Sequence, residues 1–428
     1  MSRAVARGTA INLAARLAAV GLVLALTTVA ARLGTEQQGV FALFTSVEGL
    51  LLALMSGFGI ALARRVSHHG ESSPALLGAV VLACVAAGAV AGLGLWLFSR
   101  VGPPAYASLW MLALAAPLLL LAPNVAGLWL GQGRMAPMAL VSVAPPALAL
   151  AALGAVALAQ ALALPALLAC WVAAKVTVGL VLLALLARGG RLASPDLGAL
   201  RAELPFVATI ALTNLVSLAN YRVGLFVVER VLGLSATGVY SIAVMVAELL
   251  WFVSGSLTQA VYGRIGTPDR ERAAQTTLRA LHLSWLALLV AAPLLWGAAA
   301  LILPRALGPA YAASLLPLAL LLPGVLAFGG ASAMSAFFTN HAGQPQVPAR
   351  IAAGSLAANA ALSVLLVPHW GAAGAALAAS LAYGVSVLLL ARRFAAAAGW
   401  PLATVLRPGR HWADGLRALA SRTGGPGR

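Results

Sequence analysis

Charge is scarce in this 428-residue chain, and acidic charge is scarcest. Only 9% of the residues are charged and only 10 are Asp or Glu, whereas 62% are hydrophobic. A soluble fold of this length cannot bury that much apolar surface. Apolar runs of roughly 20 residues, the length that crosses a bilayer as a helix, recur along the chain. The sequence therefore predicts an all-α polytopic membrane protein.

Residues that carry catalysis or bind metals are also sparse. The two cysteines, Cys84 and Cys170, lie in apolar runs, which argues against a disulfide framework or a thiolate metal site. The six histidines form no ligand-spaced cluster beyond His68-His69, and no phosphate-binding P-loop pattern is present. The expected outer loops are too short for an active site outside the membrane. We expect a transporter rather than an enzyme, and we expect it to bind no metal and no cofactor.

The apolar runs divide the chain into two similar sets. Twelve spans are predicted, with much helix–helix contact through small residues because alanine is abundant and aromatics are few. We expect an N-terminal lobe (1–187), a cytoplasmic linker (188–202), a C-terminal lobe (203–394) and a basic cytoplasmic tail (395–428). In residues 410–422 of the tail, helical spacing of apolar residues allows an interfacial helix on anionic lipid, or the tail is loosely ordered. The predicted spans are 9–31, 40–63, 75–98, 106–131, 138–160, 164–187, 204–228, 238–262, 277–303, 312–338, 347–367 and 371–394.

The basic residues give the orientation. Twenty Arg residues fall on one side of the predicted membrane and four (Arg32, Arg100, Arg230 and Arg305) on the other, and three cationic residues lie within spans. A five-to-one bias over short loops places both termini in the cytoplasm, and we expect the protein in the cytoplasmic (inner) membrane. The same bias explains the net charge of +17 without a nucleic-acid partner.

A short turn occurs twice in the sequence. Leu33-Gly34, four residues and Gly39-Val40 recur as Leu232-Gly233, four residues and Gly238-Val239, with an offset of 199. This offset is close to half of the apolar region, so the two six-helix sets are predicted to be repeats. Since six is even, both sets enter the membrane from the same side. Parallel repeats of this kind leave a substrate cavity between two lobes.

Five charged residues fall inside predicted spans, where a charge costs at least about 2.5–3.5 kcal/mol and needs a reason. Arg16 shares a helix face with Asn12, and Arg222 shares one with Asn214 and is accompanied by Asn220. These faces can line a cavity and bind phosphate through bidentate hydrogen bonds. The only lysine, Lys175, is a further candidate. The residues singled out for a cavity site are Arg16, Arg222, Lys175, Asn12, Asn214 and Asn220.

The two acids within spans, Glu48 and Glu248, leave an alternative open. They can form buried ion pairs, Arg16 with Glu48 and Arg222 with Glu248, and this alternative is compatible with a cavity site. They can instead carry protons, because burial raises the pKa of a carboxyl group toward neutrality. An arginine partner opposes this by holding the carboxylate ionised, so pairing is favoured over proton carriage.

Four stretches of the chain resemble a known family. They are the opening ARGTAINLAARLAAVGLVLALTTVAARLGTEQQGVFALF, then ANYRVGLFVVERVLGLSATGVYSIAVMVAELLW, LGPAYAASLLPLALLLPGVLAFG and NAALSVLLVPHWGAAGAALAASLAYG. They resemble Wzx-type oligosaccharide flippases of the multidrug/oligosaccharidyl-lipid/polysaccharide exporter superfamily, up to about residue 394. The resemblance implies two six-helix lobes, alternating access and polysaccharide biosynthesis. The implied substrate is an oligosaccharide on polyprenyl pyrophosphate, moved from the cytoplasmic to the outer leaflet, with membrane lipids and other polysaccharide assembly proteins as partners.

One position departs from that family. Its members often have an aspartate two residues after the arginine, where this chain has Gly224 after Arg222 and Val223. The departure weakens any ion coupling through a carboxylate there. Two other functions are alternatives. A drug/cation antiporter of the same fold needs an acidic cavity, whereas cations exceed acids three to two in the spans. A membrane-embedded glycan polymerase or ligase needs a sizeable outer loop with polar catalytic groups, and none is evident.

Overall fold

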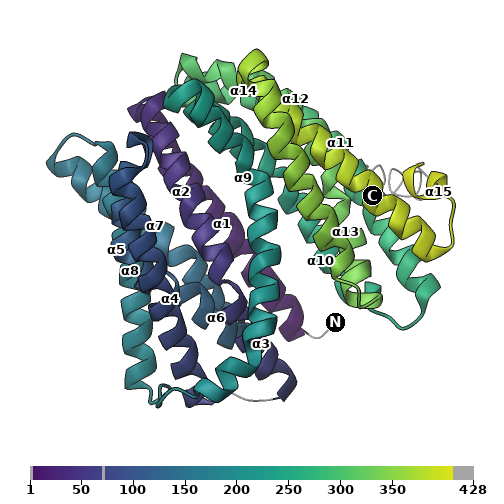
Figure 1. Ribbon diagram of the computed structural model, residues 1–428, viewed down its shortest axis with the longest axis horizontal. Coiled ribbons are helices and arrows are strands. Elements are labelled where there is room, and N and C mark those ends of the chain that lie inside the picture. Colours follow the sequence, from purple (N-terminus) through teal and green to yellow (C-terminus); the bar gives the residue numbers. More distant parts are fainter. Residues whose placement is uncertain (1–2, 70–72, 408–428) are drawn as a thin grey trace, which may run out of the picture. The chain divides into compact units, whose positions relative to one another are not determined.

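The described residues form helices and connecting turns (Figure 1). The computed structural model describes residues 3–69 and 73–407, with side chains described for 14–67, 73–259 and 261–407. The tail helix considered for 410–422 and the side chain of Asn12 lie outside those ranges. The elements are, in chain order, α1(Arg3–Leu33), α2(Thr35–Met55), α3(Gly57–His69), α4(Pro74–Val101), η1(Pro104–Leu109), α5(Trp110–Leu119), α6(Leu121–Gly131), α7(Met135–Ala159), α8(Leu164–Arg188), α9(Leu197–Glu248), α10(Leu250–Ile265), α11(Arg270–Ala306), η2(Pro309–Ser314), α12(Leu315–Gly329), α13(Ala331–Ala336), η3(Phe337–His341), α14(Gln346–Ala398) and α15(Leu402–Leu406).

The fold contains the twelve predicted spans. Ten helical stretches of the described chain are long and apolar enough to cross a membrane. Two of them, Leu197–Gln259 and Gln346–Ala398, contain a glycine whose backbone is not helical, Gly233 and Gly371. Each of these stretches is therefore two spans joined by a sharp turn, which gives twelve. The sequence prediction of an all-α, twelve-helix membrane protein is confirmed.

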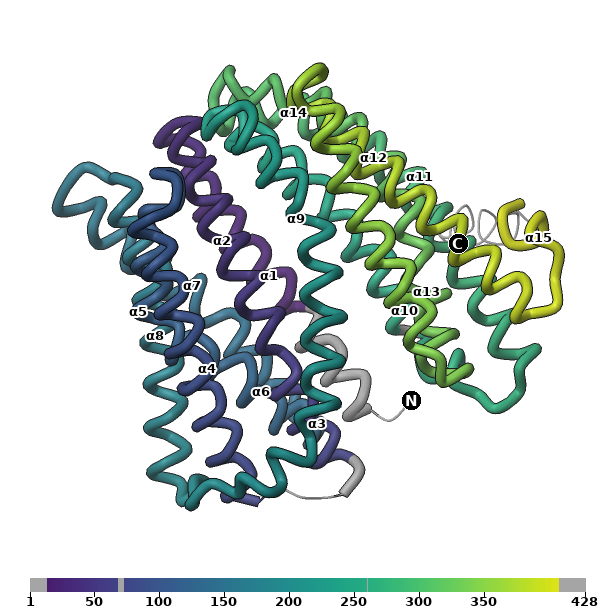
Figure 2. Tube along the Cα trace, viewed as in Figure 1, coloured from purple at the N-terminus to yellow at the C-terminus, as the bar shows by residue number. Residues whose placement is uncertain are grey.

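The repeated turn has the same backbone geometry in both places. Gly34 ends α1 at φ 134°, ψ 162°, and Gly233 interrupts α9 at φ 83°, ψ −178°. This positive-φ, extended region is open essentially to glycine alone. Each glycine thus reverses the chain between the first and second span of its set, and the reversal in α9 can be followed in Figure 2. The turn that the sequence repeats therefore has a similar local structure at both places.

A second repeated motif, which the offset of 199 does not reveal, follows the third span of each set. Arg100 is followed after three residues by Pro104-Ala105-Tyr106-Ala107, and Arg305 after three residues by Pro309-Ala310-Tyr311-Ala312. Both segments form a short 3₁₀ helix, η1 and η2, with the tyrosine buried. The offset of 205 exceeds 199 by a few residues, which simple alignment at a fixed period overlooks.

Corresponding spans of the two sets have a short interruption of regular helix at equivalent places. The second span of each set breaks, at Ser56 between α2 and α3 and at Leu249 between α9 and α10. The fourth span also breaks, at Leu120 between α5 and α6 and at Gly330 between α12 and α13. At all four residues φ and ψ stay in the right-handed helical region, so each interruption is a local turn within a continuing span.

Small residues allow the helices to approach closely. A Cβ added at Gly127 of α6 would lie 2.0 Å from the carbonyl oxygen of Gly59 in α3. Asn124, one turn earlier on α6, accepts a hydrogen bond from the Gly59 N–H at 2.8 Å and donates to the Leu120 carbonyl at 2.9 Å. The amide therefore satisfies backbone groups at both interrupted spans. Predicted packing through small residues is present here.

The chain divides into two compact units, Met1–Leu218 (unit 1) and Ala219–Arg428 (unit 2). The division falls within α9 rather than at the expected linker 188–202. Its physical reason is that the first half of α9 packs on unit 1: Glu203 pairs with Arg65 at 2.9 Å, and Val207 lies against Gly57. The segment expected to open the second lobe is thus packed on the first.

Candidate functional site

In unit 2, Arg222 and Glu248 form a bidentate ion pair. Arg222 Nη1 and Nη2 donate to the two carboxylate oxygens of Glu248 at 2.7 and 3.1 Å. The side chains keep 25% and 22% exposure, so the pair is reached from outside the packed interior. Three of the five N–H donors of Arg222 have no hydrogen-bond acceptor within the described part of the chain. The pairing expected for these two residues is present, and Arg222 retains capacity for another anion.

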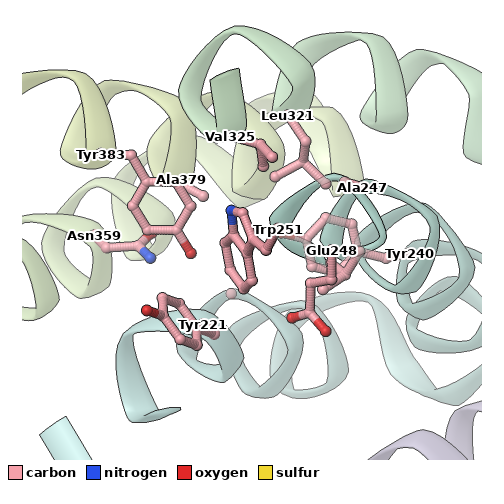
Figure 3. Close-up of a pocket in the computed structure, with 12 residues that line it drawn as sticks. Tyr221, Tyr240, Ala247, Glu248, Trp251, Leu321, Val325, Asn359, Ala379 and Tyr383 are labelled. Atoms are coloured by element: carbon pink, nitrogen blue, oxygen red, sulfur yellow. The ribbon is translucent and has the colours of Figure 1, made fainter. Parts of the chain in front are cut away.

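An aromatic cluster borders this pair. The ring of Tyr221 lies 4.5 Å from Trp251 and 5.9 Å from Phe328, and Phe328 lies 5.1 Å from Tyr383. Figure 3 shows the Trp251 indole between Tyr221 on one side and the apolar side chains of α12 on the other, with the carboxylate of Glu248 beside it. The cavity beside the pair is about 10 Å³, room for about one water molecule. It is too small to hold an organic ligand in this conformation.

Gly224 also lines the cavity. A Cβ added there would lie 3.0 Å from the hydroxyl of Tyr240 and 3.6 Å from Ala375. The space that an aspartate would occupy at this position is therefore filled by Tyr240. The departure from the family pattern is matched by the packing around it.

Asn220 lies in a different environment from the one expected. It is 2% exposed, its Nδ2 donates to Ser355 Oγ at 3.1 Å, and its carbonyl and Oδ1 accept from Asn359 Nδ2 at 2.8 and 3.2 Å. Ser363 extends the network by donating to Asn359 Oδ1. The expectation that Asn220 faces a substrate cavity is corrected: its amide joins α9 to α14, because buried amides in a bundle find partners on neighbouring helices.

In unit 1, Glu48 is the centre of a second charged cluster. It is 2% exposed and accepts from both Lys175 Nζ and Trp171 Nε1, the latter at 2.7 Å. Lys175 also lies 4.2 Å from the Trp171 ring centroid, and its own side chain is 20% exposed. Trp171 and Lys175 are four residues apart on α8 and share a helix face, so one turn of α8 supplies both donors. The pairing expected between Arg16 and Glu48 is wrong, because α8 occupies that carboxylate.

Arg16 is left without an acid. Its side chain is exposed on α1, and no carboxylate within the described ranges lies at ion-pair distance from it. It stands eleven residues, about three turns, before Thr27, which is buried on the same side of the helix. Arg16 therefore lies on the same side of α1 as the buried Thr27, but is itself exposed.

Asn214 belongs to unit 1 although Arg222, eight residues later, belongs to unit 2. Its Nδ2 donates to Ser56 Oγ at 2.8 Å, at the break between α2 and α3. The hydroxyl of Ser56 donates in turn to the Ala53 carbonyl at 2.7 Å. Asn214 is half-buried and binds the second span of unit 1 at its interruption. Arg222, on the same face of α9, binds Glu248 in unit 2, so the two residues have contacts in different units.

Among the five charges singled out in the sequence, Glu48 and Lys175 thus form a compensated pair in unit 1, Arg222 and Glu248 form one in unit 2, and Arg16 is an additional cation. Sequence reasoning found all five charges but not Trp171, which completes the Glu48 site. The four-residue spacing between Trp171 and Lys175 was the available signal.

Comparison with solved structures assigns the fold. The structure is similar to an inward-facing multidrug resistance MATE family transporter of the MOP superfamily (TM-score 0.72, 15% identity, 88% of this chain and 94% of that chain). It is similar to the lipid II flippase MurJ in an inward closed conformation (TM-score 0.73, 13% identity, 98% and 93%). A third similar structure is a MOP superfamily transporter from Pyrococcus furiosus, described as having a binding pocket of reverse polarity (TM-score 0.64, 14% identity, 92% and 96%).

No family model and no curated protein matches the sequence. At 13–15% identity, these structures show a shared fold, over 88–98% of this chain. The two-lobe architecture expected from the sequence is confirmed by them.

Proposed function

We propose that this protein is a membrane flippase that translocates a polyprenyl-pyrophosphate-linked oligosaccharide. The substrate moves from the cytoplasmic to the outer leaflet by alternating access, for biosynthesis of a cell-surface polysaccharide. The protein acts in the cytoplasmic membrane with both termini in the cytoplasm and works with other polysaccharide assembly proteins. Its chemistry is binding and release, with no covalent step.

The observation that carries this proposal is the surplus of accessible cationic groups in the spans. Arg16 is exposed and has no acid partner in the described chain, and Arg222 keeps N–H donors and a quarter of its surface while paired. A cation in a span costs free energy unless it has a partner or a function. A pyrophosphate supplies two adjacent anionic groups, which arginine binds by charge-assisted, bidentate hydrogen bonds.

The pairs suggest how the site is kept stable between substrates. Glu248 neutralises Arg222 while the site is empty, which lowers the cost of holding the guanidinium in the membrane. A phosphate that approaches the exposed side of Arg222 can add to the pair or replace Glu248 as its partner. Lys175 is held by a buried carboxylate and contributes positive potential rather than a direct contact.

The similarity to MurJ supports a lipid-linked substrate, because that protein is described as a lipid II flippase. The similarity to MATE transporters leaves a drug/cation antiporter as the alternative from the fold alone. The charges favour the flippase. The aromatic cluster beside Glu248 would suit a cation, but Arg222 already neutralises that carboxylate.

The same charges argue against proton carriage by the two glutamates. Glu48 is bound by Lys175 and Trp171, and Glu248 by Arg222. A cationic partner stabilises the carboxylate over the neutral acid. We therefore expect translocation by purified protein in liposomes to continue at the same rate when the proton gradient is collapsed. A rate that falls with the gradient, and that Glu248→Gln makes insensitive to it, would assign Glu248 to coupling.

The direct experiment measures export of lipid-linked glycan in cells that carry Arg16→Ala or Arg222→Ala. Both variants are expected to accumulate the lipid-linked intermediate on the cytoplasmic side, with the amount of protein in the membrane unchanged. Arg305→Ala is the matched control, because that arginine lies at a helix end and donates to the carbonyl of Leu301 on its own helix. Export at the wild-type rate in both test variants would refute the site.

A further inference from the structure

Unit 1 contains a second cavity, separate from the charge pairs. It lies where α4 ends and where η1, α5 and α8 begin, and its volume is about 590 Å³. Ligand sites have typical volumes of about 300–1,000 Å³. Its lining is mostly apolar with a single charged residue, and includes Arg100, Ser108, Trp110, Met111, Leu164 and Leu168.

Arg100 is unusual for its position. The topology predicted from the sequence places it on the side that carries four arginines against twenty, where the positive-inside bias disfavours a cation. Its guanidinium stacks 5.6 Å from the ring of Trp96, its side chain is exposed, and it donates no hydrogen bond to a protein group in the described ranges. Its donors are therefore available to a ligand.

The second repeat provides an internal comparison. Arg305 occupies the position equivalent to Arg100, with three residues between it and the same Pro-Ala-Tyr-Ala segment. Its Nη1 donates to the carbonyl of Leu301 at 2.6 Å, so its own helix supplies an acceptor. The same motif thus carries in unit 2 an exposed arginine that donates to its own helix, and in unit 1 an arginine that lines a cavity.

The surroundings of Arg100 are those of a membrane interface. Trp96, Trp110 and Phe98 are exposed together with Val101, all within the end of α4 and the start of α5. Tryptophan concentrates at the level of lipid head groups, where one edge of the ring is apolar and the other is wet. An apolar cavity with one cation at this level complements an amphiphile whose head group is anionic.

We propose that this cavity binds one anionic phospholipid. Its phosphate is held by Arg100, with the hydroxyl of Ser108 as a second donor, and its acyl chains begin along Trp110, Met111 and Leu168. Arginine and phosphate form charge-assisted hydrogen bonds. The site does not depend on the flippase proposal, because a membrane phospholipid is available to a transporter of any substrate.

The test is native mass spectrometry of the full-length protein in detergent, titrated with phosphatidylglycerol or phosphatidylcholine. The wild-type protein is expected to bind one phosphatidylglycerol more tightly than phosphatidylcholine. Arg100→Ala should weaken that binding about tenfold or more, the usual loss for a hydrogen bond to a charged group. Arg305→Ala, which removes the same charge at the equivalent position, should leave it unchanged.

A second variant tests the cavity without changing its charge. Ala107 lines the cavity and is exposed, so Ala107→Trp fills the space while Arg100 is retained. It should abolish the preference for phosphatidylglycerol, with the unfolding temperature as a check on folding. Equal losses in Arg100→Ala and Arg305→Ala would show general surface attraction and overturn the proposal. So would displacement of phosphatidylglycerol by equimolar undecaprenyl pyrophosphate, which would assign the site to a transport substrate.

Discussion

The two units each hold an ion pair between spans, but the pairs differ in how deeply they are buried. In unit 1 the acid is the buried partner: Glu48 is 2% exposed and is held by both Lys175 and Trp171. In unit 2 the acid and the base are almost equally accessible, at 22% for Glu248 and 25% for Arg222. A buried carboxylate cannot exchange its partner without leaving a charge unpaired, whereas a partly hydrated pair can. We infer that the unit 1 pair is structural and the unit 2 pair serves binding.

The largest effect is expected from Lys175→Ala. The substitution leaves Glu48 buried with only the Trp171 N–H as a partner, and removing one member of a buried pair costs about 3–5 kcal/mol. Thermal unfolding of the protein purified in detergent measures it. The double variant Glu48→Gln, Lys175→Met removes both charges and should recover most of the loss. If the double variant is no more stable than Lys175→Ala, the uncompensated charge is not the cause.

Arg222→Ala is expected to be milder in stability, about 2 kcal/mol, because water reaches Glu248 when its partner is removed. Its effect on translocation should be far larger than its effect on the unfolding temperature. Lys175→Ala should show the opposite order. Measuring the translocation rate and the unfolding temperature for both variants tests the contrast between the units. If the ratio of the two effects is the same in Arg222→Ala and Lys175→Ala, the pairs do not differ in role.

Trp171→Phe separates the hydrogen bond from the ring. Phenylalanine keeps an aromatic face beside Lys175 but loses the indole N–H that donates to Glu48 at 2.7 Å. The expected loss is about 1.5 kcal/mol, the lower value for a hydrogen bond to a charged group, because Lys175 still compensates the carboxylate. Trp251→Phe, in the aromatic cluster of unit 2, is the matched control and should not affect Glu48. No change in unfolding temperature would mean that Lys175 alone stabilises Glu48.

The smallest effect is expected from Asn214→Ala, about 0.6 kcal/mol, the average for a hydrogen bond between membrane helices. The bond lost is the one to Ser56 at 2.8 Å, which lies at the break between α2 and α3. Hydrogen exchange of the backbone around Ser56 should rise more than the global stability falls. Unchanged exchange in that segment would show that the break is held by backbone packing alone.

The candidate site was only partly predictable. The charges themselves are visible in the sequence, because an ionised side chain within an apolar run stands out and must have a reason. The pairing of Arg222 with Glu248, which the sequence leaves as one alternative, is present in the structure, and the two residues lie on consecutive spans joined by a short turn. Glu48 was assigned to Arg16 for the same reason, but its partners come from α8, more than 120 residues away. The sequence predicts Asn220 as a cavity residue, whereas its partners lie on α14.

The sequence by itself determined the membrane-spanning architecture: twelve helices, two sets of six and the glycine turn that repeats between them. These features follow from the length of apolar runs and from a backbone conformation that requires glycine, both of which are local. The tertiary structure alone decided which carboxylate meets which cation, that α9 is shared between the two units, and that equivalent arginines of the repeated Pro-Ala-Tyr-Ala motif have different surroundings. Those outcomes depend on which helix faces meet in space. The periodicity of a sequence identifies a face of a helix, but it does not identify the helix against which that face packs.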